Sequence, residues 1–134
     1  MLPFRLIYHD SYDLRLGRHV FPSVKYRMIR DLLLAEGIAA ADDFLTPEPA
    51  SLDDLLLAHD AAWIRRLRTG TLTMAEIVRL EIPYSRSIVD AFILAAGGST
   101  LAARCALQHG LAFNLGGGFH PALYGHGEGF CAIN

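Results

Sequence analysis

The stretch that most constrains the fold of this chain is "LAFNLGGG", residues 111–118. An apolar run of strand length is followed by three consecutive glycines, which allow the backbone to turn sharply and to approach a ligand closely. The stretch therefore predicts a buried strand over 111–115 with a glycine turn at its carboxyl end. In parallel sheets, binding sites lie at this end of the strands.

Two segments near the N-terminus predict a further strand and a helix. The apolar run "FRLIYHD" over 4–10 predicts a buried strand with His9 at its exit. A helix is expected over 23–37, with Pro22 in its first turn and Gly37 at its C-terminus. Its packing face is predicted from four residues at helical spacing: Val24, Met28, Leu32 and Ala35.

Capping residues predict the middle of the chain to be helical. Ser51 with Asp54 forms a capping box, and Asp60 can cap a second helix, so 51–70 holds either one helix or two short ones in tandem. Gly70 follows the last turn as a stop signal.

A longer helix is expected over 87–110, beginning with a capping box of Ser87 and Asp90. Gly97 and Gly98 lie inside it, where a glycine costs about 1 kcal/mol relative to alanine. Their presence predicts a closely packed neighbour on that part of the helix.

This order of elements predicts an α/β fold with a parallel sheet, as one domain over 1–134. Hydrophobic residues make up 52% of the chain and charged residues 19%, which is the balance of a globular domain with a core to bury. Only two clear strand candidates are present, and two strands make a poor sheet. We therefore expect the front part of a longer domain, incomplete at the C-terminus.

Charge and cysteine patterning exclude several classes of partner and site. The net charge of -2 predicts no binding to nucleic acid or to an anionic membrane. The longest apolar run, Ala91–Ala96, is too short to cross a bilayer, and the N-terminus lacks the order of a signal peptide, so a cytoplasmic location is expected. Cys105 and Cys131 lack C-x-x-C spacing, so neither a disulfide nor a cysteine-based metal site is expected, and Cys105 is expected to be buried. The basic residues are almost all arginine, which indicates a bacterial composition.

Known phosphate-binding motifs do not account for the glycine loop. The P-loop pattern G-x-x-x-x-G-K-[ST] and the dinucleotide fingerprint G-x-G-x-x-G are both absent. What remains is a loop that carries one imidazole, His120, beside bare backbone. On the residues alone, His120 is either a chemical group or a structural one.

The stretch "NLGGGFHPALYGHGEGFCAIN" resembles the active-site segment of the zinc-dependent histone deacetylase family. Members read GGGFHHA or a close variant, followed at this spacing by G-[FY]-C-x-x-N. Upstream, "HVFPSVKY", "DLLLAHDAAWIRRL" and "GGSTLAARCAL" resemble segments of class IV-like and bacterial deacetylases. The resemblance implies a three-layer arginase/deacetylase-like fold, here only its N-terminal part, and zinc-dependent hydrolysis of acyl-lysine or a similar acylated amine.

The resemblance also implies roles for individual residues. His120 matches the first histidine of the family's pair, which hydrogen-bonds the zinc-bound water and stabilises charge in the transition state. Gly129 matches the position whose carbonyl accepts the substrate amide N–H, and Gly118 the close backbone approach near the acyl pocket. Phe119 would lie at the deep end of the substrate tunnel and Phe130 along its wall. Without the resemblance, either phenylalanine is as readily an ordinary core aromatic.

The sequence departs from the family in two ways. Pro121 stands where the family has its second histidine, the general acid and base, and losing such a group typically costs about 10²- to 10⁴-fold in rate. His126 is the alternative proton carrier, but it is expected to be a solvent-exposed loop residue. The family's zinc ligands, an Asp-x-His pair and a later aspartate, fall beyond Asn134, so no metal ligand is expected within the chain.

Two functions remain open from the sequence. One is part of a zinc-dependent deacylase. The other is a truncated, catalytically inactive relative that acts as a binding or interaction module or is a gene remnant. In both cases helices that normally cover a larger sheet would expose apolar faces, so self-association of the chain is expected.

Overall fold

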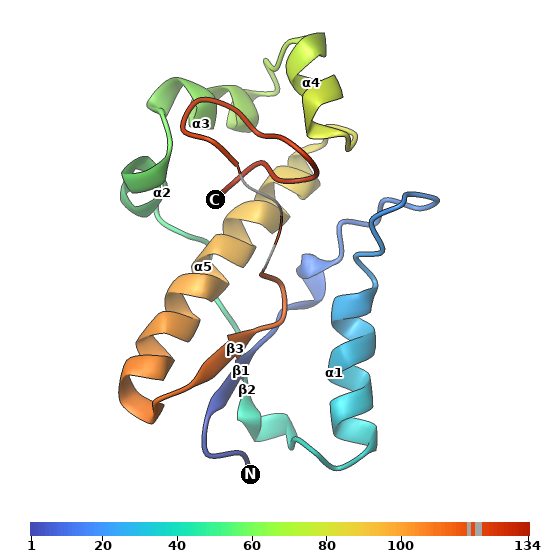
Figure 1. Ribbon diagram of the computed structural model, residues 1–134, viewed down its shortest axis with the longest axis vertical. Helices are drawn as coiled ribbons and strands as arrows, with labels where there is room; N and C mark the ends of the chain where they lie inside the picture. The colour runs from blue at the N-terminus through green and yellow to red at the C-terminus, as the bar shows by residue number, and fades with distance from the viewer. Residues whose placement is uncertain (118, 120–121) are drawn as a thin grey trace.

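The computed structural model describes residues 1–117, 119 and 122–134. Its helices and strands follow an α/β order along the chain (Figure 1). The elements are β1 (Arg5–Ile7), the 3₁₀ turn η1 (Asp10–Tyr12), α1 (Lys25–Ala35), the 3₁₀ turn η2 (Ala41–Asp43), β2 (Phe44–Leu45), α2 (Leu52–Ala58), α3 (Ala61–Thr69), α4 (Met74–Leu80), α5 (Arg86–His109) and β3 (Ala112–Asn114).

The sheet is small and entirely parallel, with the strand order β2-β1-β3. Leu6 of β1 pairs with Phe44 of β2 on one side and with Phe113 of β3 on the other. Figure 1 shows this sheet between α5 on one side and α1 on the other, which gives three layers. The predicted α/β fold with a parallel sheet is thus confirmed.

The strand after α5 is shorter and lies elsewhere than the sequence suggested. It spans Ala112–Asn114 within the expected 111–115 and is parallel, as predicted. The apolar run also predicted a buried and central strand, and both expectations are wrong: β1 is the middle strand of the three that the structure describes, and Phe113 of β3 is 48% exposed. The two-residue strand β2 was not predicted, since a run as short as Phe44–Leu45 has no periodicity.

In the long helix α5, Gly97 and Gly98 both have the closely packed neighbours that were predicted, but the N-cap residue differs from the predicted one. A side-chain carbon at Gly97 would collide with the backbone of Glu48 and Ala50, and one at Gly98 with the hydroxyl of Tyr12. The capping box predicted from Ser87 and Asp90 is wrong. Ser85 is the N-cap, and its hydroxyl accepts a hydrogen bond from the N–H of Ile88.

The region 51–70 forms two helices in tandem, the second of the two alternatives. Ser51 caps α2 by accepting from the N–H of Asp54, and Asp60 caps α3 by accepting from the N–H of Ala62. Helix α3 ends at Gly70 in the left-handed conformation. Helix α4, which was not predicted, opens with a reciprocal capping box of Thr73 and Glu76.

Helix α1 buries a different face from the predicted one. Tyr26 is its buried residue, whereas Met28 and Leu32 of the predicted packing face are 62% and 56% exposed. The aromatic ring of Tyr26 packs in a buried cluster with Tyr8 and Tyr12, and this contact determines which face of α1 is buried.

The core lies between α5, α3 and the C-terminal segment. Its fully buried side chains include Trp63 and Leu67 of α3 and Phe92 of α5. By length and apolar composition α5 resembles a membrane-crossing helix, but 56% of its most apolar window is buried inside the fold. Helix α5 is the central helix of the fold and covers one face of the sheet (Figure 1).

Candidate active-site loop and cavity

The start of the glycine loop is fixed by the side chain of Asn114 at the end of β3. Its Oδ1 accepts hydrogen bonds from the Tyr12 hydroxyl at 2.8 Å and from the N–H of Gly116 at 3.3 Å. Its Nδ2 donates to the Ala95 carbonyl at 2.9 Å and to the Ser99 hydroxyl at 3.1 Å. One side chain therefore joins β3 and the loop to η1 and to α5.

Tyr12 of η1 contacts both Asn114 and the first glycine of the loop. Its side chain is 2% exposed, and burial raises the pKa of Tyr12 well above its ordinary value, so the hydroxyl stays protonated and donates to Asn114. A side chain at Gly116 would collide with the ring of Tyr12. The first loop glycine is thus required for close packing against Tyr12, whereas the three-glycine run had been predicted to allow approach to a ligand.

Aromatic rings gather where the loop leaves the sheet. Phe119 stacks on Phe21 with ring centroids 5.2 Å apart and meets Phe92 of α5 edge to face at 4.8 Å. Phe130 packs on the same ring, Phe21, at 5.9 Å. The structure therefore brings both predicted tunnel residues to one shared neighbour. We call Phe21, Phe92, Phe119 and Phe130 the aromatic cluster.

Phe130 is held in an unusual backbone conformation. Its φ is +69°, in the left-handed region that bulky residues rarely adopt. The N–H of Gly129 donates to the Arg79 carbonyl at 3.2 Å, and the N–H of Phe130 donates to the Leu80 carbonyl at 2.8 Å. These two bonds hold the turn against the end of α4. A strained backbone conformation of this kind persists only where the surrounding structure holds it in place, and such residues occur most often at functional sites.

A buried histidine secures the segment after the loop. The His59 side chain is 1% exposed, and its Nε2 accepts from the N–H of Asn134 at 2.9 Å. That nitrogen therefore carries no proton, so Nδ1 is protonated and donates to the Leu123 carbonyl at 3.0 Å. His59, the C-cap residue of α2, thus joins the end of that helix to both ends of the segment 122–134.

Trp63 and Asp60 add two further attachments to the same segment. The indole Nε1 of the fully buried Trp63 donates to the Ala132 carbonyl at 3.0 Å. The backbone N–H of Asp60 donates to the Tyr124 carbonyl at 2.9 Å. Helix α3 and its N-cap thus position 122–134, which carries Gly129 and Phe130.

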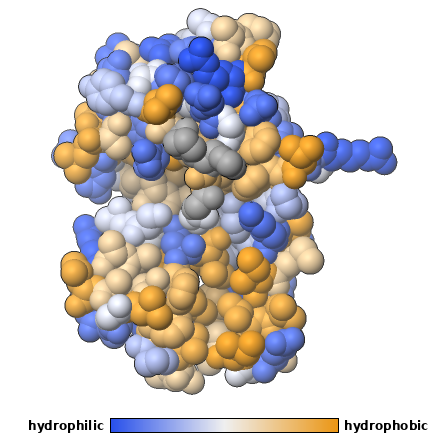
Figure 2. All heavy atoms as spheres, viewed as in Figure 1, coloured by the Kyte–Doolittle hydropathy of each residue, from blue (hydrophilic) through white to orange (hydrophobic). Residues whose placement is uncertain are grey.

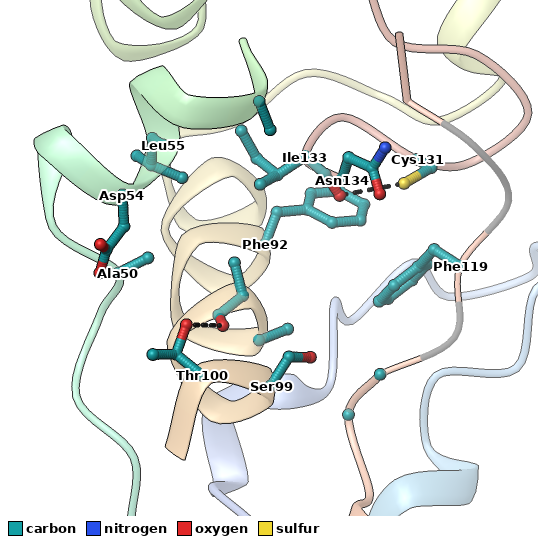
Figure 3. A pocket seen from close by; sticks show the side chains of 15 residues that line it. Ala50, Asp54, Leu55, Phe92, Ser99, Thr100, Phe119, Cys131, Ile133 and Asn134 are labelled. Carbon is teal, nitrogen blue, oxygen red and sulfur yellow. Dashed lines mark hydrogen bonds between the residues drawn. The ribbon is translucent and has the colours of Figure 1, made fainter. Parts of the chain in front are cut away.

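A cavity of about 440 Å³, open on one side, lies beside the glycine loop. Figure 3 shows it between α5, the end of α2, the glycine loop and the C-terminal segment, with Phe119 pointing from the loop toward α5. Phe92, Ile133 and Asn134 line it together with the backbone of Gly116 and Gly117. The cavity has both apolar and polar lining residues, and it lies at the carboxyl end of β3, where the sequence placed a site.

The predicted site residues have different outcomes. Phe119 lines the cavity, whereas Phe130 packs on Phe21 and is not among the lining residues. Gly129 lies in the turn that precedes Phe130, with φ of +54°. Gly118 and His120, like Pro121, lie outside the residues that the structure describes.

His126 and the two cysteines are all partly or fully buried. His126 is only partly exposed and lies 3.5 Å from the carboxylate of Glu128. Cys105 and Cys131 are both buried, and burial raises the pKa of the Cys131 thiol, which makes it a poor nucleophile. Within 1–117, 119 and 122–134, no three His, Cys, Asp or Glu side chains come together as a metal-binding group.

The histone deacetylase domain family matches residues 19–134, which include the loop, the aromatic cluster and the segment 122–134. The chain belongs to this family. Its fold agrees with that of a solved relative, the HD domain of HDA15, with a TM-score of 0.76 at 18% identity over 97% of this chain and 39% of the other.

Curated relatives place this histone deacetylase domain chain within longer proteins. It is 36% identical over 132 residues to an uncharacterized protein of Picosynechococcus, covering 98% of this chain and 44% of that protein. It is 30% identical over 139 residues to histone deacetylase 2 of Arabidopsis thaliana, covering 96% and 36%. The chain thus spans less than half the length of these curated relatives.

Sequence reasoning missed the residues that hold the site together. Four of these residues form hydrogen bonds to partners 64 to 102 residues away in the chain: Asn114, Tyr12, His59 and Trp63. A pattern among neighbouring residues cannot predict such pairs. The one signal available was an asparagine two residues before the first glycine of the run. A polar side chain at the end of an apolar strand needs hydrogen-bond partners once buried.

Proposed function

We propose that this chain forms one wall of the acyl-amide hydrolysis site of a zinc-dependent deacetylase, whose substrate is acyl-lysine or a similar acylated amine. The observation that carries the proposal is the packing of Phe119 and Phe130 on Phe21 beside the cavity at the carboxyl end of β3. Aromatic rings converging there suit the methylenes of a lysine side chain. Relatives named histone deacetylase 2 and probable deacetylase support the substrate class.

Within this proposal, the residues of the loop have distinct tasks. His120 stabilises charge that develops as water attacks the amide, a task for which imidazole is suited near neutral pH. The Gly129 carbonyl accepts the substrate amide N–H, and Gly118 leaves room for the acyl group. The hydrogen bonds from Gly129 and Phe130 to the end of α4 support this by holding their turn in one conformation.

Zinc is the cofactor of the family, but the described residues do not form a site for it. A zinc site requires three or four His, Cys, Asp or Glu ligands at one point. No step that depends on the metal is therefore assigned to these residues. The ligands would have to come from elsewhere.

A second candidate function is a non-catalytic binding module of the same family. The proline at 121, where relatives have a proton-transferring histidine, favours it. The cavity and aromatic cluster would then retain affinity for an acylated amine without hydrolysing it.

The test compares four proteins: this chain and its Pro121→His variant, each alone and each fused to the part of the Picosynechococcus relative outside the matched region. Metal content and turnover of an acetyl-lysine amide are measured on all four. We expect neither stoichiometric zinc nor turnover from the unfused chains, because the residues that the structure describes form no metal-binding group. The fused proteins should both bind zinc, with low activity for proline and about 10²-fold higher activity for histidine.

Each alternative result has a clear meaning. Zinc binding and turnover by the unfused chain would overturn the view that its metal site is incomplete. Equal activity of the two fused proteins would show that position 121 does not carry the proton. A zinc-loaded fusion that stays inactive with histidine would favour the binding module.

A further inference from the structure

His19 joins three segments that meet beside the aromatic cluster. It lies in the loop 13–24 between η1 and α1 and is partly buried. Its Nε2 is 2.7 Å from the Glu81 carbonyl at the end of α4, and its Nδ1 accepts from the N–H of Phe21 at 3.0 Å. Its ring meets that of Phe130 edge to face, with centroids 5.3 Å apart. One imidazole thus contacts the loop itself, the end of α4 and the C-terminal segment.

The partners of His19 determine which of its nitrogens carries the proton. A backbone N–H can only donate, so Nδ1, which accepts from Phe21, carries no proton. A carbonyl oxygen can only accept, so Nε2 carries the proton and donates to Glu81. The contacts therefore require a neutral imidazole. A protonated ring would place a second N–H at Nδ1, facing the N–H of Phe21, and the hydrogen bond between them could not form.

Phe21 connects His19 to the rest of the aromatic cluster. Its ring stacks on Phe119 at 5.2 Å and packs on Phe130 at 5.9 Å. Phe119 in turn lines the cavity. The bond from the Phe21 N–H to His19 holds the backbone of Phe21, and thereby the ring that the two other phenylalanines share. Loss of this bond therefore acts on the cavity wall through Phe21.

The loop that carries His19 holds backbone strain. Arg15 has φ of +52°, in the left-handed region that is unfavourable for residues other than glycine. Figure 2 shows this loop at the right edge of the molecule, where a hydrophilic tip projects from the surface and apolar side chains lie at its base. The contacts that hold the loop, including both hydrogen bonds of His19, must offset this strain. Weakening one of them therefore favours movement of the loop.

The elements in contact with His19 carry charged groups of both signs. They are Asp13, Arg15 and Arg18 on its own loop, Lys25 of α1 with its ammonium 4.9 Å from the centre of the Phe21 ring, Arg79 and Glu81 at the end of α4, and His126 and Glu128, 3.5 Å apart, on the C-terminal segment. The carboxylates favour a protonated imidazole and the cations oppose it. Because His126 is also an imidazole, the experiment has to separate its effect from that of His19.

We propose that His19 is a positioning residue, whose neutral form holds the aromatic cluster at the cavity and whose protonation releases it. In this step Nδ1 takes up one proton from water and the hydrogen bond from the Phe21 N–H is lost. The consequence for an acylated amine rests on the proposed function: the cavity wall loosens below neutral pH, and affinity falls. The switch itself involves only contacts within the chain and is tested without substrate.

The first experiment follows the full chain from about pH 8 to about pH 5, a range in which imidazoles change charge while ordinary carboxyls stay ionised. Hydrogen exchange at the ring carbon of His19 and at the amides of Phe21 and Phe130 is measured by mass spectrometry at low protein concentration. Each amide rate is corrected for its intrinsic dependence on pH. We expect protection of both amides to fall as His19 takes up its proton, at Phe21 by about fivefold or more, because one hydrogen bond is lost.

The decisive variant is His19→Asn. Asparagine accepts a hydrogen bond from the N–H two residues on but does not titrate, so Phe21 should stay protected across the whole pH range. His19→Leu, which removes both side-chain bonds, should show low protection at every pH. His9→Asn is the matched control, because the Nδ1 of His9 accepts from the N–H of Ser11 at 2.9 Å in the same local geometry. It should leave the pH dependence at Phe21 unchanged, as should His126→Asn.

A second measurement connects the switch to the proposed function. In the fused Pro121→His protein, KM for the acetyl-lysine amide is measured at about pH 8 and about pH 5.5, with and without His19→Asn. We expect acidification to raise KM by about fivefold or more relative to its effect in the His19→Asn protein, because binding at the wall is lost. The value of kcat is recorded alongside, which separates binding from proton transfer.

Three results would overturn the proposal. The first is constant protection of Phe21 while the His19 ring titrates. The second is an unchanged pH dependence in a folded His19→Asn variant. The third is loss of the pH dependence in His9→Asn or His126→Asn. Protection that titrates with His19 while KM stays constant would support the switch and contradict the proposed substrate wall, so the two failures are distinguishable.

Discussion

The carboxylate of Asp43 lies fully buried just before β2 and ties the start of the chain to the sheet. Its Oδ2 accepts from the N–H of Ala40 at 2.8 Å and its Oδ1 from the N–H of Leu2 at 2.9 Å, with the guanidinium of Arg5 3.7 Å away. The hydrogen bond from Ala40, followed by that from Leu2 and the charge of Arg5, holds the pKa of Asp43 below its usual value despite burial.

This lowered pKa predicts a defined dependence of stability on pH. A carboxyl with a lower pKa in the folded state stabilises the fold above its unfolded pKa of about 4, and this contribution is lost as pH falls through the folded value. Asp43→Asn should therefore lower the free energy of unfolding at pH 7, and the difference from the unmodified chain should shrink below about pH 4. Urea unfolding at several pH values measures it.

Asp42→Asn is the matched control for this prediction, because Asp42 is the exposed neighbour in the same 3₁₀ turn. It should leave the pH dependence nearly unchanged. A constant difference between Asp43→Asn and the unmodified chain from pH 7 to pH 3 would contradict the role given to the Asp43 charge.

At the scale of elements, α5 and the loop around Glu48–Ala50 lie closer together than side chains allow. A side-chain carbon at Gly97 would fall within 2.8 Å of the Ala50 nitrogen and still closer to the Glu48 carbonyl. The Ala50 N–H in turn donates to the Ile93 carbonyl at 3.1 Å. The two glycines thus allow α5 to serve as the floor of the cavity.

Gly97→Ala should destabilise the chain although alanine is the better helix former. Helix propensity alone would add about 1 kcal/mol, but overpacking against backbone typically costs about 1–3 kcal/mol, and backbone cannot swing aside as a side chain can. Thermal unfolding followed by circular dichroism measures the result. Ala103→Gly, at an exposed position of α5, calibrates the propensity alone. A rise in melting temperature for Gly97→Ala would show that the contact is loose.

Local sequence signals predicted the ends of elements better than their burial. Ser51, Asp60 and Gly70 marked the helix ends correctly because capping depends on neighbours within four residues. The predicted packing face of α1 was wrong because the burial of a helix face depends on which other elements pack against it. The structure buries Tyr26 and leaves Met28 exposed. For the site, the glycine turn and Phe119 were predicted, whereas His59 and Asn114 were not, because their partners are distant in sequence.

At the scale of the whole molecule, this domain portion leaves much apolar surface uncovered. Met28, Leu32 and Ile38 on and after α1 are each more than half exposed, as is Val78 of α4. Contiguous apolar surface of this kind drives association in water. The expected self-association is therefore attributed first to α1.

Sedimentation should show association of the chain at about tens of micromolar, a range in which weak contacts between exposed apolar surfaces appear. Replacing Met28 and Leu32 together with lysine should shift the chain toward monomer. Asp31→Lys on the same helix is the control, because it changes the net charge equally without removing apolar surface. A compact monomer before any substitution, or equal shifts for both variants, would contradict the role of α1.

The buried indole of Trp63 has a practical consequence. Trp63 is the single tryptophan of the chain, and its Nε1 is bonded to Ala132 within the segment that carries Gly129 and Phe130. The tryptophan fluorescence of the protein therefore originates from one indole in contact with the segment 122–134. Detachment of that segment would admit water to the indole and shift the emission to longer wavelength, so docking of this part of the chain can be followed optically without a label.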